Sequence, residues 1–275
     1  MPATLTQKQF DTIAAIARAR WGLHFGENKR TLVQNRLSKF LLRSPYESVE
    51  HYLRRLNGSP TDEDLLTFFD LLSTNTTSFF REMNHFQHLE RVVYPRLAGA
   101  RPDRNLRIWS AACSSGAEPY SLAIHLHETF RRLSAWNVRI LGTDLSRSSI
   151  DIARRGVYPG NAISDLPEIT IRKHFHRVGS GPDALHQVKP HIRSMVSVQP
   201  LNLMDRWPMK GPFDIIFLRN VMIYFDLEVR TRLIRRVRDI LAPDGVLFIG
   251  SAETLSGMDV GFKTEIPSAY TRTNG

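Results

Sequence analysis

A near-continuous apolar run from Phe213 to Leu218 is the feature that most constrains the fold of this chain. An apolar run of this length, without polar alternation, is typical of a strand covered by helices on both faces. The run ends abruptly, and Arg219, Asn220 and Tyr224 follow it. Because ligands bind outside the carboxyl ends of the strands in open α/β sheets, this segment predicts a ligand site as well as a buried strand.

Strand-like and helix-like patterns alternate from residue 106 onwards. Strands are predicted at residues 106–111, 138–143, 213–218 and 246–250, and helices at 118–133, 147–155 and 227–241. Residues 261–265 and 269–272 are predicted to form a final antiparallel pair. This alternation is typical of a parallel sheet with right-handed crossover connections. Residues 171–200 interrupt it with a turn at 179–182 between short runs at 174–178 and 187–192, which predicts an inserted β-hairpin.

The N-terminal part has helical patterns instead. Residues 6–92 contain no convincing strand, and their apolar residues recur at helical spacing near residues 10–17 and 32–41. Thr61 to Asp64 predicts the start of another helix through a capping box. Residues 97–104 are predicted to be a linker or loop because they combine glycine, proline and charged residues.

The charge of the chain is strongly positive and unevenly distributed. The 275 residues carry a formal net charge of +10, and residues 1–60 hold ten Lys/Arg against four Asp/Glu. Such an excess favours an anionic partner. Arg36, Lys39 and Arg43 share one side of the predicted helix at 32–41. Taken alone, these residues favour a solvated helix face, and a docking surface for an acidic partner is the alternative.

Several classes of protein are excluded by the composition. The single cysteine, Cys113, cannot form an internal disulfide or a CxxC zinc site, and it fits a reducing cytoplasm. No stretch approaches the roughly 20 apolar residues of a membrane span. His85 and His88 lie three residues apart but have no evident third ligand, so no metal site is expected.

Two strand ends carry residues suited to a nucleoside-containing cofactor. Small residues from Ala112 to Gly116 follow the first strand, where they allow close backbone approach to a ligand. The segment is neither a GxGxxG nor a Walker-type loop, and a simple tight turn would have the same composition. Asp144 ends the second strand, where a carboxylate can accept hydrogen bonds from a ribose diol. The alternative is that Asp144 or Ser146 caps the next helix.

Four blocks of sequence, taken together, resemble the CheR-type chemotaxis receptor methyltransferases. The blocks fall in family order at residues 75–82, 112–121, 143–146 and 213–225, and the resemblance extends over roughly residues 10–272. It implies an α/β fold in which a Rossmann-like class I methyltransferase domain follows a small all-α domain. The implied domains are residues 1–85 and 86–275, with a small β-subdomain inserted at about 171–200.

The resemblance also implies an activity and partners. Members transfer a methyl group from S-adenosylmethionine to glutamate side chains of chemoreceptors, leaving S-adenosylhomocysteine and a glutamate methyl ester that serves sensory adaptation in chemotaxis. The expected partners are the cytoplasmic helical region of the receptor and, at the β-subdomain, a receptor C-terminal peptide. A cytoplasmic monomer recruited to membrane-bound receptor arrays is expected, without nucleic acid and without membrane insertion.

Two residues are implied to be catalytic. Arg81 matches the family arginine that pairs with the methionine carboxylate of the cofactor, a task that suits a guanidinium. Tyr224 matches the residue that faces the reacting methyl group, where it would orient the acceptor without removing a proton.

The implied cofactor-binding residues share positions at strand ends or in the segment before the first strand. They are Asn75, Thr77, Arg81, Glu118, Asp144, Asn202, Leu203, Asn220 and Val221. Asp144 is the better candidate for the ribose, Asn202 and Leu203 for the adenine, and Asn220 with Val221 for the methionine side. No role is assigned to Arg219.

Some positions depart from the family pattern. Ala117 stands where Glu or Gln is frequent, and Ser251 stands where His is frequent. Asp244 precedes Gly245 in place of a glycine pair. Family members that bind a receptor C-terminal peptide use a glycine-rich loop, and here Gly179 and Gly181 lack a third glycine nearby.

Two other classes of protein compete with the receptor methyltransferase. The basic charge favours a nucleic-acid methyltransferase, but those that modify base amino groups often carry Pro-Pro-Tyr/Phe after the fourth strand, where this chain has Arg219, Asn220 and Val221. A non-catalytic descendant is disfavoured by the retention of Arg81, Asp144, Asn220 and Tyr224.

Overall fold

The chain is divided into two compact units in the computed structural model, which describes residues 5–273. The first, here the helical unit, contains the residues up to Thr74 together with Asn202–Arg206 and Tyr224–Arg230. The second, here the sheet unit, contains Asn75–Leu201, Trp207–Ile223 and the residues from Thr231 onwards. Within residues 5–273, no helix combines the length and the apolar character that crossing a membrane requires.

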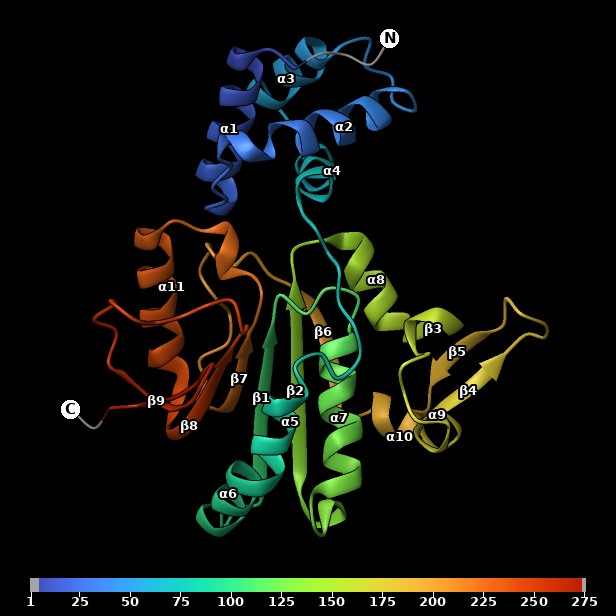
Figure 1. Cartoon of the computed structure of the whole chain (residues 1–275), viewed down its shortest axis with the longest axis vertical. Helices are drawn as coiled ribbons and strands as arrows, with labels where there is room; N and C mark the ends of the chain where they lie inside the picture. Colours follow the sequence, from blue (N-terminus) through green and yellow to red (C-terminus); the bar gives the residue numbers. More distant parts are fainter. Residues whose placement is uncertain (1–4, 274–275) are drawn as a thin grey trace. The chain divides into compact units, whose positions relative to one another are not determined.

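The helical unit is built from four helices (Figure 1): α1 (Gln7–Trp21), α2 (Arg30–Leu41), α3 (Val49–Asn57) and α4 (Asp62–Leu72). The capping box predicted at Thr61 and Asp64 is confirmed at the start of α4. A second capping box, formed by Thr6 and Gln9, begins α1. The helices enclose a core of fully buried side chains that includes Phe10, Ile13, Leu37, Tyr52 and Phe68.

Two later segments of the chain return to the helical unit. The amide of His24 donates to the carbonyl of Tyr224 at 2.7 Å, and Leu23 forms an isolated antiparallel bridge with Phe225. Arg18 pairs with Asp226 at 2.8 Å. The unit is therefore discontinuous in sequence, a property that local patterns could not predict.

A seven-stranded sheet forms the centre of the sheet unit. Its strand order is β6 (Val196–Pro200), β2 (Asn137–Asp144), β1 (Asn105–Ala111), β7 (Phe213–Leu218), β8 (Leu241–Ile249), β10 (Ala269–Arg272) and β9 (Phe262–Ile266). The pairs from β6 to β8 are parallel, while β10 is antiparallel to β8 and β9. The predicted parallel sheet with a final antiparallel pair is confirmed, and all six residues of β7 are buried, as its apolar run predicts.

The strand register places three carboxyl ends together. Ala111, the last residue of β1, pairs with Thr143 near the end of β2 and with Leu218 at the end of β7. The chain leaves β1 towards β2 on one side and later returns to β7 on the other. The polar residues that follow these strands are consequently neighbours at one edge of the sheet, as expected for a ligand site at such a reversal of strand order.

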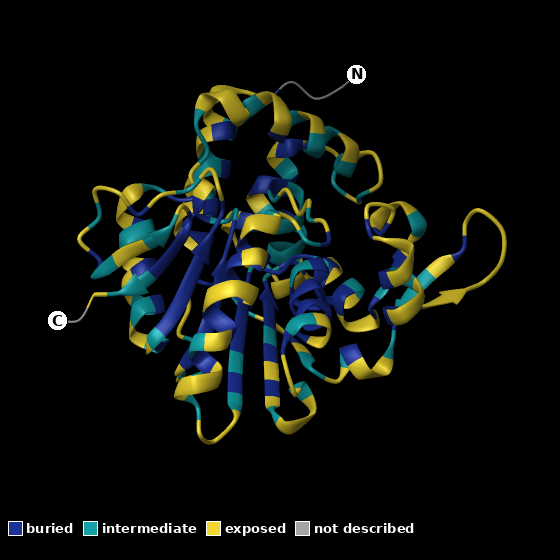
Figure 2. Ribbon diagram, turned by 60° about the horizontal axis from the view of Figure 1, so that its bottom comes forward, coloured by how far each residue is buried: buried dark blue, intermediate teal, exposed yellow. Residues whose placement is uncertain are grey.

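Helices α7 (Ala117–Thr129), α8 (Arg147–Arg155) and α11 (Leu227–Ile240) agree with the helices predicted between strands. Three further elements precede β1: α5 (Met83–His88), a π-helical turn η2 (Leu89–Val93) and α6 (Tyr94–Ala100). The loop predicted at 97–104 is wrong in its first half, because α6 continues to Ala100 and Leu97 is fully buried in the core. Figure 2 shows the buried strands among helices whose outer surfaces are exposed.

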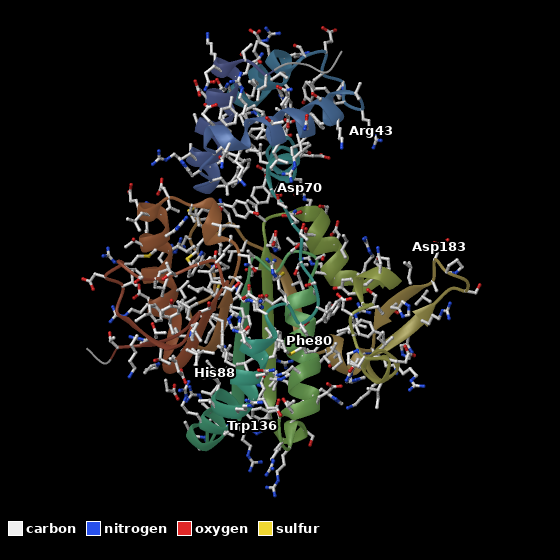
Figure 3. The ribbon with its side chains drawn as sticks, in the orientation of Figure 1. Arg43, Asp70, Phe80, His88, Trp136 and Asp183 are labelled. Carbon is white, nitrogen blue, oxygen red and sulfur yellow. The ribbon has the colours of Figure 1, made fainter. Side chains whose placement is uncertain are left out.

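A small three-stranded sheet carries the predicted hairpin. Its order is β3 (Val157–Pro159), β5 (Leu185–Val188) and β4 (Phe175–Val178), and α9 (Glu168–His174) lies between β3 and β4 in the chain. The β4–β5 hairpin is confirmed, with Asp183 at its tip (Figure 3). The second arm predicted at 187–192 is wrong beyond Val188, because Pro190, which has no N–H to donate to a sheet, begins α10 (Pro190–Arg193).

The segment before α5 belongs to the sheet unit. Asn75 begins this unit, ahead of the boundary near residue 85 that the sequence suggests. Phe79 and Phe86 lie in its hydrophobic core, and the carbonyl of Asn75 accepts a hydrogen bond from Ser114 Oγ at 2.7 Å. The last residues of the insertion predicted at 171–200 form β6, which pairs with β2 and so is part of the large sheet.

Two histidines in the sheet unit are held neutral by burial. Burial lowers the pKa of His85 to about 4, an effect to which the nearby Arg219 adds. Burial likewise lowers the pKa of His125 to about 4, and its Nδ1 lies 3.2 Å from the buried Tyr94 hydroxyl. Unfolding returns both groups to water and to an ordinary pKa of about 6.5. Between pH 6.5 and 4 the unfolded state therefore binds more protons than the folded state.

We expect the free energy of unfolding to fall as the pH drops from 6.5 towards 4, whereas above pH 6.5 these groups contribute no pH dependence. Linkage between protonation and folding lowers the free energy of unfolding by about 2 kcal/mol per histidine between pH 7.5 and pH 5. Urea titrations at pH 7.5 and pH 5 measure it. The loss should be about 2 kcal/mol smaller in His125→Gln and unchanged in His176→Gln, which alters an exposed side chain. Equal losses in all three proteins would contradict neutral burial of His125.

Candidate active site

A tight loop connects β1 to α7. Ala112, Ser114 and Gly116 have φ values of 59°, 50° and 89°, so the loop repeatedly enters the left-handed region. A Cβ on Gly116 would lie 2.7 Å from the Cβ of Ala153 in α8, closer than any normal contact. Only glycine fits there. The loop backbone is thereby fixed beside the ends of β1 and β2.

Asp144 anchors this loop. Its Oδ2 accepts a hydrogen bond from the amide of Ser114 at 2.7 Å, and its Oδ1 accepts one from the amide of Ser146 at 2.9 Å. Ser146 caps α8 by accepting from the amide of Ser149. Of the two capping candidates, Ser146 is therefore the one used. Because each carboxylate oxygen has two lone pairs, Asp144 can hold the loop and also accept from a ribose hydroxyl.

Arg219, which the sequence left without a role, is the cation of a buried charge network. Its side chain is 2% exposed and follows β7 directly. The guanidinium lies 3.1 Å from a carboxylate oxygen of Glu82 and 3.1 Å from one of Glu118. It also donates to the carbonyl of Arg81. One buried arginine thus connects the end of β7, the start of α7 and the segment before α5.

The two carboxylates of this network respond differently to burial. Burial raises the pKa of Glu118, although Arg219 and a 2.6 Å hydrogen bond from Ser110 oppose the shift. Burial also acts to raise the pKa of Glu82, but Arg219 and hydrogen bonds from Ser251 outweigh it and the pKa is lowered. Ser251 donates to Glu82 through both its amide and its hydroxyl.

Glu253 organises the turn that carries Asn220. Its carboxylate accepts hydrogen bonds from the amides of Asn220 at 2.9 Å, Met222 at 2.7 Å and Ile223 at 3.2 Å. It also accepts from Gly250 at 2.6 Å, where a Cβ would lie only 2.4 Å from the Asn220 side-chain nitrogen. Sequence reasoning missed this role of Glu253. The available signal was an acid directly after the closing strand.

The segment from Asn75 to Glu82 crosses the start of α7. The amide of Phe80 donates to Ser121 Oγ of α7 at 2.9 Å, and Phe80 is marked in Figure 3. Phe80 and Glu82 both have positive φ, of 51° and 61°. Arg81 lies between them, is exposed, and donates to the carbonyl of Thr76 at 3.4 Å.

Three predicted site residues belong to the helical unit. Asn202 donates from its amide nitrogen to the carbonyl of Arg20 at 3.1 Å and accepts at Oδ1 from Met204. Leu203 is buried. The Tyr224 hydroxyl donates to the carbonyl of Thr74 at 3.4 Å. Their proposed contacts with a cofactor stay predictions.

The sheet unit therefore brings together part of the predicted set. Asp144, the 112–116 loop and the turn at Asn220 and Val221 lie at the carboxyl ends of three adjacent strands. Carboxylate and amide groups at this edge match the hydroxyls of a nucleoside, and the exposed guanidinium of Arg81 matches an anionic group. The residues present fit a nucleoside cofactor that carries a carboxylate. Fold and site together define a Rossmann-like protein of the cofactor-binding class.

Comparison with known proteins places the chain within that class. Residues 75–270 match the family described as CheR methyltransferase, SAM binding domain, and residues 8–73 match CheR methyltransferase, all-alpha domain. The chain is 37% identical to chemotaxis protein methyltransferase 2 of Pseudomonas aeruginosa, covering 90% of this chain and 87% of that protein. It is 36% identical to the chemotaxis protein methyltransferase of Borreliella burgdorferi, with 92% and 90% covered. For the Escherichia coli chemotaxis protein methyltransferase the identity is 34%, with 97% and 91% covered.

The chain belongs to the CheR methyltransferase family. The resemblance stated from the four sequence blocks is confirmed. The expected fold class, an all-α domain followed by a Rossmann-like methyltransferase domain with a small β-subdomain, is confirmed as well. S-adenosylmethionine is the cofactor of this family's sheet domain.

Proposed function

We propose that this protein methylates glutamate side chains of chemoreceptors with S-adenosylmethionine, producing glutamate methyl esters for sensory adaptation. The observation that carries the proposal is family membership over nearly the whole chain, together with the polar edge formed by β2, β1 and β7. The protein is thus an enzyme, a protein-glutamate O-methyltransferase, and S-adenosylhomocysteine is its product.

Each candidate residue has a role in this proposal. Arg81 binds the methionine carboxylate of the cofactor, and its exposure supports this role. Asp144 accepts from the ribose. The remaining cofactor contacts are shared among Asn75, Thr77, Glu118, Asn202, Leu203, Asn220 and Val221. For Glu118 the hydrogen bonds from Arg219 and Ser110 support this role, because they hold its carboxylate in a defined position.

The reaction needs little acid–base assistance. The cofactor supplies a methyl group already activated on a sulfonium sulfur. A glutamate acceptor with an ordinary pKa of about 4.3 is ionised near pH 7, so no base has to remove a proton from it. The task of the protein is to position the carboxylate and exclude water from it. We assign this positioning to Tyr224.

Transfer of labelled methyl groups to receptor-containing membranes tests the function. Label on receptor protein that is released by mild base supports a carboxyl ester. A receptor whose candidate glutamates are replaced by alanine is the control and should remain unlabelled. Label on RNA, with none on receptor, would instead establish the nucleic-acid methyltransferase alternative.

Tyr224→Phe is expected to slow turnover more than it weakens cofactor binding. The hydroxyl orients the acceptor in this proposal, and a misplaced acceptor typically costs about 100-fold in rate. Single-turnover methylation of receptor measures the effect, and calorimetric titration with S-adenosylmethionine serves as the control. A normal single-turnover rate would refute the assignment to Tyr224.

The predicted basic face of α2 differs from the expectation at Arg36 and at Arg43, and Arg43 lies beyond Leu41, where α2 ends. Arg36 donates to the carbonyls of Leu72 at 2.9 Å and Ser73 at 2.7 Å, so it closes the C-terminal end of α4. Lys39 and Arg43 remain exposed, and Leu42 between them is 86% exposed (Figure 3 marks Arg43). We propose that Lys39 and Arg43 dock on acidic receptor helices, while Arg36 is structural.

Lys39→Glu/Arg43→Glu is expected to lower kcat/KM for receptor methylation at least about tenfold at low salt and to reduce its salt dependence, because charge complementarity mainly sets the association rate. Affinity for S-adenosylmethionine should not change. Lys8→Glu/Arg54→Glu is the matched control, since it reverses two other exposed cations of the helical unit. Equal losses in both double variants would show a general charge effect and contradict a docking site at Lys39 and Arg43.

The small sheet offers a second proposed contact. A groove of about 680 Å³ is lined by residues that include Phe175, Arg177 and His186. Its cationic lining supports binding of a receptor C-terminal peptide, which ends in a carboxylate. We also propose that the protein acts as a cytoplasmic monomer that is recruited to membrane-bound receptor arrays through these contacts.

A further inference from the structure

Three histidines from three helices converge within the sheet unit. His127 lies in the last turn of α7, His174 ends α9, and His191 lies in α10. One ring nitrogen from each lies within 4.8 Å of the other two. Figure 1 shows α10 between α7 and the small sheet. The cluster therefore joins α7 to α9 and α10, the two helices that flank the β4–β5 hairpin.

Two of these nitrogens are hydrogen-bonded to each other, at a distance that also fits two ligands of one metal ion. His174 Nδ1 lies 3.2 Å from His191 Nε2. In a tetrahedral site with zinc–nitrogen bonds of about 2.0–2.1 Å, neighbouring ligand nitrogens are about 3.3 Å apart. His174 is fully buried and fixed, whereas His127 and His191 are exposed. The exposed imidazoles can complete the coordination by small side-chain rotations.

Glu128 orients the buried member of the cluster. Its Oε1 lies 3.0 Å from His174 Nε2 and accepts a hydrogen bond from that nitrogen. The proton is thus placed on Nε2, and the Nδ1 lone pair is directed towards His191. Metal-binding histidines usually donate their second N–H to a carboxylate in this way.

The cluster is accessible from solvent. A cavity of about 490 Å³ is lined by His127 together with Ser194 and Met195, which follow α10. The cavity provides space for an ion and a water molecule beside His127, and His191 is itself exposed to solvent. Three protein ligands and one water are the usual set of an open zinc site.

We propose that His127, His174 and His191 bind a divalent transition-metal ion, with Zn²⁺ the best match to three imidazoles and a water. The ion would fasten α9 and α10 to α7 and so restrain the hairpin that they flank. Hard ions such as Mg²⁺ and Ca²⁺ are disfavoured by an all-nitrogen ligand set. The sequence predicted no metal because the ligands are far apart along the chain. This proposal does not depend on the methyltransferase assignment.

Calorimetric titration of the full chain, free of any histidine tag, with Zn²⁺ alone tests the site. We expect one ion per chain, and Co²⁺ should give the intense visible absorption of a four-coordinate ion. His127→Ala and His191→Ala alter exposed side chains, so the fold should persist, and each should lower affinity at least about tenfold. Glu128→Gln should lower it about 10- to 100-fold. His176→Ala, which removes an exposed histidine of β4, is the matched control and should bind normally.

Hydrogen exchange gives a readout that surface binding would not produce. Zn²⁺ should slow amide exchange in β4 and β5 of the wild-type protein but not of His191→Ala. Absence of binding at 100-fold ion excess would overturn the proposal. So would wild-type affinity in both His127→Ala and His191→Ala, or an equal loss in His176→Ala, which would indicate scattered surface histidines.

Discussion

Replacing Arg219 by methionine should lower the free energy of unfolding by about 3–5 kcal/mol. The substitution leaves the largely buried carboxylates of Glu82 and Glu118, whose side chains are each 13% exposed, without their shared cation. Removal of one partner from a buried ion pair is costly because the remaining charge has lost its solvation and its counter-charge. Urea titration at pH 7.5 measures the loss.

The pH dependence of the variant separates this electrostatic effect from lost packing. Burial already raises the pKa of Glu118 in the intact network, and loss of Arg219 should raise it further. A carboxyl group with a raised folded-state pKa destabilises the folded state when it is ionised, at pH values above that pKa. Protonation at lower pH removes this destabilisation. The difference in the free energy of unfolding between wild type and Arg219→Met should therefore shrink as the pH is lowered towards 5.

Two control variants sharpen the interpretation. Arg219→Met/Glu118→Gln should be more stable than Arg219→Met because one buried charge is removed together with its partner. Arg172→Met replaces an exposed arginine and should stay within about 0.5 kcal/mol of wild type. A loss below 1 kcal/mol in Arg219→Met, or no dependence on pH, would show that the network contributes little.

Arg81→Ala should weaken S-adenosylmethionine binding about 100-fold or more while leaving stability unchanged. Two charge-assisted hydrogen bonds to a carboxylate, each contributing about 1.5–3 kcal/mol, are lost together. The side chain is exposed and donates to one carbonyl, that of Thr76. Truncation therefore breaks little of the folded structure. Calorimetric titration with the cofactor measures affinity, and thermal unfolding measures stability.

Variants of neighbouring cations distinguish a specific contact from general charge. Arg81→Lys keeps the charge but loses the planar fork, so its affinity should lie between those of wild type and Arg81→Ala. Arg91→Ala removes another exposed cation, on η2, and should bind the cofactor normally. Unchanged calorimetric affinity in Arg81→Ala would remove this residue from the site.

The local pattern of the sequence predicts most strands and helices of the sheet unit correctly. The apolar run at Phe213–Leu218 specifies a strand buried on both faces, and β7 is such a strand. The capping box at Thr61 and the β4–β5 hairpin were predicted for the same reason, since their signals lie within a few neighbouring residues. Errors occur where tertiary packing prevails, as at Leu97, whose burial in the core keeps α6 helical in a segment of loop-like composition.

By itself, the sequence determined the alternation of elements, the family and the set of candidate residues, because periodicity and motif order are local or linear properties. The partners of the charged residues were decided only by the tertiary structure. Arg219 meets Glu118 across 101 residues and Glu82 across 137, and Arg36 closes α4. His127, His174 and His191 likewise meet only when three helices pack together. Such contacts depend on which strand ends and helix ends the topology makes neighbours, and this information is not present in any single stretch of the chain.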